Sequence, residues 1–85
     1  MSRTKDESFL LRLYDVVIQH EDIYGPVDRY EIGHAIGLHP KGVETICKTL
    51  LRTNFIKQDH DDPHLITITQ NGIKLAKQIK EESKL

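Results

Sequence analysis

Apolar residues in this chain follow helical spacing over four stretches, and they alternate with polar residues between the third stretch and the fourth. In the first stretch, Leu10, Leu13, Tyr14 and Val17 share one stripe, which apolar neighbours widen on both sides. The pattern predicts a helix over residues 6–20, after a polar lead at residues 1–5. The wide stripe fits burial by several neighbouring elements or a flank used for dimerisation, and both alternatives stay open.

A second helix is predicted over residues 28–36, after the break at Tyr24-Gly25-Pro26. Asp28 can accept a hydrogen bond from the amide of Glu31, whose side chain can reach back. Its inward side is expected to hold Ile32, Ala35 and Ile36. Gly33 lies inside this helix, where glycine costs about 1 kcal/mol relative to alanine. A close approach by the neighbouring helix would account for it.

A third helix is predicted over residues 40–53. Gly37 can take the left-handed conformation that ends the second helix, and Pro40 suits the first turn of the next one. The buried stripe of the third helix is formed by Val43, Ile46, Cys47 and Leu50. Asn54 tolerates the left-handed conformation after its last turn. Two helices joined by so tight a turn form a helix-turn-helix unit.

A hairpin over residues 55–69 and a last helix over residues 70–83 complete the pattern, and Thr69 can cap that helix. The hairpin strands are expected at residues 55–58 and 65–69. The predicted fold is therefore mainly α with a small β-hairpin, one domain over residues 1–85, in the order α-α-α-β-β-α. A hairpin directly after a helix-turn-helix is a wing.

Several motifs in this order resemble the winged helix-turn-helix superfamily, in particular small MarR-like regulators. They are Glu31-Ile32-Gly33, Ile36-Gly37-Leu38, the core positions Val43, Ile46 and Leu50, Asn54-Phe55-Ile56-Lys57 and Ile68-Thr69-Gln70-Asn71-Gly72. The resemblance implies that the third helix reads a DNA major groove. It departs from the usual pattern at His39, where Ser or Thr is common, and in the acidic wing.

The third helix has an outward face that suits nucleic acid. A projection at 100° per residue groups Lys41, Thr45, Lys48 and Arg52 opposite the buried stripe, with Thr49 beside them. Lysine and arginine can reach phosphates or guanine edges, and threonine can contact either. We therefore predict groove contacts from this face, helped by His39, and phosphate contacts from Arg29 and Lys57.

The wing loop carries Asp59, Asp61 and Asp62, which a DNA backbone would repel. We expect its tip to stay out of the minor groove. His60 and His64 lie among these carboxylates, but no metal site is predicted, because a structural zinc site normally offers cysteine or a firmer ligand set.

Composition narrows the class of protein. The 85 residues have a net charge of −1, so any attraction to nucleic acid must come from charge placement. The single cysteine, Cys47, lies on a buried stripe and fits a reducing compartment. With no membrane span or secretory segment recognised, the expected location is cytoplasmic. No residue constellation supports catalysis, and no cofactor is predicted.

Two functions follow from these patterns. The first is a transcriptional regulator that binds double-stranded DNA as a homodimer, through the first helix, the last helix or both. A second copy is expected because one helix buries little surface. The alternative is a winged-helix module that binds proteins without binding DNA, which the net charge and the acidic wing favour.

Overall fold

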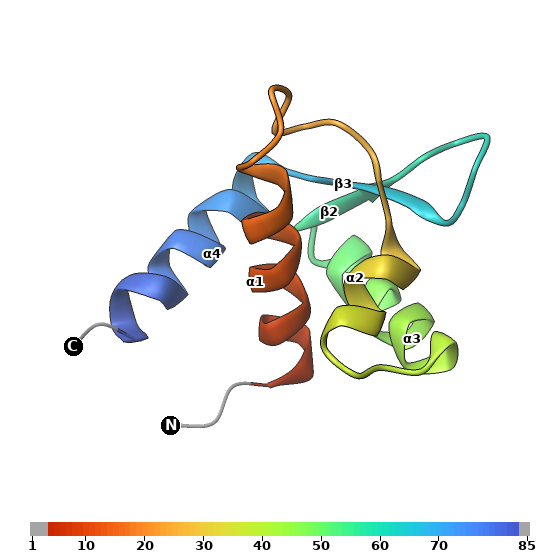
Figure 1. Cartoon of the computed structure of the whole chain (residues 1–85), viewed down its shortest axis with the longest axis horizontal. Helices are drawn as coiled ribbons and strands as arrows, with labels where there is room; N and C mark the ends of the chain where they lie inside the picture. Colours follow the sequence, from red (N-terminus) through yellow and green to blue (C-terminus); the bar gives the residue numbers. More distant parts are fainter. Residues whose placement is uncertain (1–3, 84–85) are drawn as a thin grey trace.

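The computed structural model describes residues 4–83, which form four helices and a three-stranded antiparallel sheet (Figure 1). The elements follow the order α1 Lys5–Val17, β1 Val27–Asp28, α2 Arg29–Ala35, α3 Pro40–Arg52, β2 Ile56–Gln58, β3 Leu65–Ile68 and α4 Gln70–Ser83. The expected mainly α architecture with a wing is confirmed. The last helix has the bounds expected from the sequence, whereas α2, α3 and both wing strands are each slightly shorter.

The sheet has one strand more than the predicted hairpin. The strand order is β1-β3-β2. Val27 of β1 lies opposite Ile66 of β3, and Ile56 of β2 lies opposite Ile68 of β3. A further bond from the amide of Arg29 to the carbonyl of His64, 2.9 Å long, continues the β1 side. Two residues carry no recognisable alternation, so β1 is defined by its partner strand and not by its own pattern.

The first helix begins earlier and ends earlier than residues 6–20. Thr4 caps it: its hydroxyl accepts from the amide of Glu7, and the Glu7 carboxylate accepts from the amide of Thr4, both at 3.1 Å. Thr4 and Lys5 are thus part of the helix start, and the rest of the predicted lead lies outside the described residues. After Val17 the chain closes a tighter turn, in which the His20 amide donates to the Val17 carbonyl.

The hydrophobic core lies between α1, the inner face of the sheet and the inner faces of the other helices. Fully buried large side chains come from several elements: Phe9, Leu10, Leu13, Val17, Val43, Cys47, Ile56, Ile66 and Ile68. Burial within the chain therefore accounts for most of the wide apolar stripe of α1. Among residues 4–83 the large apolar side chains left exposed are Ile18 and Tyr24.

The turn between α2 and α3 has the geometry that glycine permits. Gly37 has φ 78°, and the amides of Gly37 and Leu38 donate to the carbonyls of His34 and Gly33, a Schellman motif that ends α2. At Gly33 an added Cβ would lie 2.1 Å from Cγ2 of Val43 in α3. The predicted close approach is therefore present, and a side chain of α3 fills the space.

The end of α3 is tied to the start of α4. Asn54 has φ 65°, the left-handed conformation expected there. The hydroxyl of Thr69 donates to the Asn54 carbonyl at 2.7 Å and accepts from the amide of Gly72 at 3.0 Å, so Thr69 caps α4 as predicted. This link holds the wing between the two helices. At the far end, Lys80 of α4 pairs with Asp15 of α1.

Candidate nucleic-acid interface

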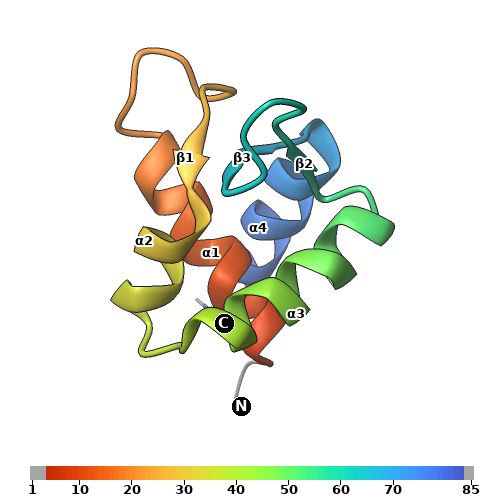
Figure 2. The ribbon, with the colours of Figure 1, turned by 90° about the vertical axis from the view of Figure 1, so that its right-hand side faces the viewer.

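Helix α3 lies at the surface of the molecule, in front of α1 and α4 when the side that carries α3 faces the viewer (Figure 2). Its inner residues Val43, Ile46, Cys47 and Leu50 are buried, as the spacing predicts. Its outer residues Lys41, Thr45, Lys48 and Arg52 are exposed, and Thr49 is half-buried beside them. The predicted groove-facing residues are thus brought together on one helix face.

Threonine hydroxyls on this face bond to the helix itself. Oγ1 of Thr45 donates to the Lys41 carbonyl at 3.0 Å, and Oγ1 of Thr49 donates to the Thr45 carbonyl at 3.4 Å. A threonine hydroxyl has one hydrogen to donate, so in this arrangement it keeps only acceptor capacity for a ligand. The cations around them are then the hydrogen-bond donors that this face offers.

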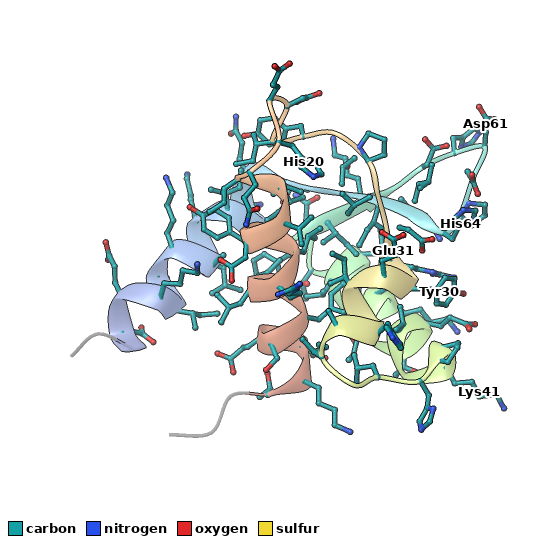
Figure 3. All side chains as sticks on the ribbon, in the orientation of Figure 1. His20, Tyr30, Glu31, Lys41, Asp61 and His64 are labelled. Atoms are coloured by element: carbon teal, nitrogen blue, oxygen red, sulfur yellow. The ribbon has the colours of Figure 1, made fainter. Side chains whose placement is uncertain are left out.

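His39 occupies the N-cap position of α3 and is exposed, with Pro40 directly after it. Within the described part of the chain its side chain makes no capping hydrogen bond. Lys41, the second residue of α3, points away from the body of the protein (Figure 3). The N-terminal end of α3 therefore presents both side chains to solvent.

Arg29 is held differently from the cations of α3. Its guanidinium donates to the Tyr30 hydroxyl at 2.9 Å and lies over the Tyr30 ring, 4.9 Å from the centroid. Its Nε is buried and has no hydrogen-bond partner among residues 4–83. Arg29 is thus a half-buried residue at the start of α2, whereas the sequence suggested a phosphate contact.

The thiol of Cys47 lies close to the same guanidinium. Burial raises the pKa of Cys47 from 9.0 to about 11, although the positive charge of Arg29 and a hydrogen bond from it act in the lowering direction. A thiol with so high a pKa is protonated at neutral pH and is a poor nucleophile. The interpretation of Cys47 as a small buried core residue fits this environment.

Lys57 lies in β2, opposite Thr67 of β3, and its side chain is exposed. Together with Tyr24, Asn54 and Asn71 it lines an open hollow of about 490 Å³. The hollow joins the end of α3 to the start of α4. Lys57 therefore belongs to the outer face of the wing sheet, beyond the end of α3.

The wing loop uses its carboxylates to build its own turn. Oδ1 of Asp59 accepts from the amides of Asp61 and Asp62, at 2.9 and 3.0 Å. Oδ1 of Asp62 lies 2.6 Å from Nδ1 of His64. Asp61 lies at the far tip of the loop, on the same side of the molecule as Lys41 (Figure 3). The loop is thus a turn, as its polar sequence suggested, and an aspartate two and three residues before backbone amides is a recognisable signal for it.

Among residues 4–83, no group of three or more histidine, cysteine, aspartate or glutamate side chains could hold a metal ion. The same residues include no helix long and apolar enough to cross a membrane. The candidate site is therefore described by its exposed cations, threonines and His39 alone.

A helix-turn-helix followed by a wing hairpin, which pairs with a short strand that precedes the unit, defines the winged helix-turn-helix fold. Solved structures with this arrangement include the ZitR C30AH42A mutant of Lactococcus lactis in apo form, which is 17% identical with a TM-score of 0.67. NMB1585, a MarR family regulator from Neisseria meningitidis, is 21% identical with a TM-score of 0.64. At these identities the similarity establishes the fold: the chain is a winged helix-turn-helix domain.

The matches cover 93% of this chain and 56% of ZitR, and 91% of this chain and 54% of NMB1585. The PcaV transcriptional regulator from Streptomyces coelicolor, solved with its natural ligand, matches over 88% of this chain and 51% of its own, at 16% identity and a TM-score of 0.62. The chain thus spans about half the length of these structures. No protein-family model matches the sequence, and no curated protein matches it.

Proposed function

We propose that this chain is a DNA-binding regulator whose helix α3 enters a major groove. The observation that carries the proposal is the separation of the two sides of α3, with a buried apolar stripe inside and exposed cations outside. Residues 27–57 contain five lysines and arginines but only three aspartates and glutamates, although the whole chain has a net charge of −1. The positive charge is thus concentrated in the helix-turn-helix unit.

The proposed contacts follow from where each side chain lies. Lys41, Lys48 and Arg52 reach guanine edges or phosphates, and Thr45 and Thr49 meet bases between them. His39, exposed at the start of α3, adds to these groove contacts. Lys57 contacts a phosphate from the wing sheet, and Arg29 does so only if it leaves its place against Tyr30. The tip of the wing, with Asp61, stays out of the minor groove.

A homodimer is part of the proposal, because one helix in a groove buries too little surface for useful specificity. The second copy would pack against α1, α4 or both. Ile18, directly after α1, is 47% exposed and offers an apolar contact for such packing. Light scattering of the protein alone and bound to DNA measures the stoichiometry of this homodimer.

The proposed location is cytoplasmic, where DNA is accessible to a regulator.

The test is a salt-titrated binding assay on random-sequence duplex DNA with the wild type and the Lys48→Ala/Arg52→Ala variant. We expect affinity to fall about a hundredfold, if each cation contributes about 1.4 kcal/mol, and the salt dependence to become shallower. The matched control is Lys74→Ala/Lys77→Ala, which removes the same charge from exposed positions of α4.

Two results would contradict the proposal: no binding at low salt, or equal losses for the two double variants. The second result would mean that net charge, and not the face of α3, drives the association. Absent binding would instead favour a module that recognises proteins.

A further inference from the structure

The hydrogen bonds of Thr45 limit what this side chain can recognise. Its hydroxyl hydrogen points to the Lys41 carbonyl, 3.0 Å away, within the same helix. The side chain is exposed at the centre of the outward face of α3. What it offers to a ligand is therefore its γ-methyl group and a hydroxyl acceptor, and not a hydrogen-bond donor.

The major groove presents different chemistry at each base. Guanine offers two acceptors, which require a donor from the protein, whereas thymine is the base that carries a methyl group there. A side chain whose donor is already used matches guanine poorly and thymine well. Lys41 and Lys48, one turn to either side of Thr45, are the donors suited to guanine. On this face, Thr45 thus offers an apolar contact to a base, and the lysines on either side of it offer hydrogen-bond donors.

A second observation concerns Gly42, beside Thr45 on the helix. A Cβ added at Gly42 would have Leu38 Cδ2 as its nearest neighbour outside the helix backbone, at 3.8 Å, an ordinary contact. Packing within the chain therefore does not require glycine here, although glycine weakens a helix. The absence of a side chain leaves room for the start of α3 to lie close to a groove floor.

We propose that Thr45 is a specificity-determining residue that packs its γ-methyl group against the C5 methyl group of a thymine. The inference rests on the proposed function and adds the identity of one base that α3 reads. Since the contact is between two methyl groups, it depends on shape and burial and not on charge. Loss of it should change sequence preference while leaving the salt dependence unchanged.

The test uses a duplex enriched from a random-sequence pool on the wild-type protein, and copies of it in which single thymines are replaced by deoxyuridine. Deoxyuridine lacks only the C5 methyl group. In each half-site, we expect one thymine at which this replacement lowers the affinity of the wild type about fourfold. That loss is the value of one buried methyl-sized group. Thr45→Ser, which keeps the hydroxyl and lacks the methyl, should bind both duplexes equally. Thr45→Val, which keeps the methyl, should retain the preference.

Thr53→Ser is the matched control, because Oγ1 of Thr53 makes the same bond to a helix carbonyl, that of Thr49 at 2.9 Å, but lies at the end of α3. It should keep the full preference for thymine. Both substituted residues, Thr45 and Thr53, are exposed, so circular dichroism should show unchanged folding in all three variants.

The outcomes separate the two proposals. If no duplex is enriched, or binding does not depend on Lys48 and Arg52, the proposed function is wrong. If a duplex is enriched but every deoxyuridine copy binds as well as the original, DNA binding stands and the role of Thr45 is overturned. A thymine preference that survives in Thr45→Ser overturns it as well, because another residue must then contact the methyl group.

Discussion

The inner and outer sides of α3 differ in how much of their sequence the fold itself explains. On the inner side, Val43 fills the space left by Gly33, and Cys47 is sealed in the core. On the outer side, packing among residues 4–83 does not require the exposed lysines and arginine or the glycine at position 42. Residues that cost stability or contribute none are candidates for function, because folding alone gives no reason for them.

The wing loop sharpens this contrast, because two of its three carboxylates have a structural reason. Asp59 holds the turn through two backbone amides, and Asp62 pairs with His64. An acidic loop therefore does not by itself indicate a partner surface. The cations of α3 have no such structural partner among residues 4–83, whereas Asp59 and Asp62 of the wing do, although both groups are polar and lie at the surface.

The largest expected effect is on the inner side. Gly33→Ala places a Cβ 2.1 Å from Cγ2 of Val43, which must move or push the helices apart. We expect a loss of up to about 3 kcal/mol in the free energy of unfolding, which lowers the melting temperature by about 4–8 °C per kcal/mol. Thermal denaturation followed by circular dichroism measures it.

Val43→Ala supplies the partner for a double-mutant cycle with Gly33→Ala. If the clash is the cause, the double variant is more stable than the sum of the single losses predicts. Additive losses would show that Gly33 is needed for another reason, such as its backbone conformation.

The second-largest expected effect is a loss of folding stability at alkaline pH, caused by Cys47. Its pKa is raised from 9.0 to about 11 in the folded protein. The unfolded thiol therefore ionises first as pH rises, and the stability gained from the neutral buried thiol is present below pH 9 and lost as pH rises through about 11. The loss should approach about 3 kcal/mol, since the pKa rises by about two units and one unit corresponds to about 1.4 kcal/mol.

Urea unfolding below pH 9 and near pH 11, for the wild type and Cys47→Ala, isolates this contribution. The variant lacks only the thiol, so it should lose less stability over the same interval. Equal losses would show that burial of the thiol does not govern the alkaline response.

Periodicity predicts the helices and the two sides of α3, because an amphipathic helix records its environment in local spacing. The strand β1 is not predictable in this way, since Val27 becomes a strand residue through pairing with Ile66. Ala35 was expected to face inward and is exposed, because α2 ends there and the chain turns away. Helical spacing is a weak guide to the last residue of a seven-residue helix.

The hydrogen-bond and stacking partners of side chains are also not predictable from the sequence. Asp28 was expected to cap the amide of Glu31, but it accepts from Tyr30 instead, at 2.9 Å. Nothing in the spacing of Arg29 showed that it stacks on Tyr30. Whether this cation extends into solvent or stacks on a ring depends on the space beside the start of α2, which forms only when the helices pack.

The smallest expected effect is the most direct test of the contrast between the two sides of α3. Gly42→Ala adds a methyl group where the chain has room for it, with Leu38 Cδ2 at 3.8 Å. We expect the free energy of unfolding to rise by up to about 1 kcal/mol, because alanine favours the helix. DNA affinity should fall about fivefold, because the added methyl holds α3 away from the groove floor. Stability and affinity, measured on the same preparation, would then move in opposite directions, as they do at a position kept for binding. A variant that gains stability at undiminished affinity would show that α3 does not approach DNA closely at this end, and the proposed reading by Thr45 would lose its second support.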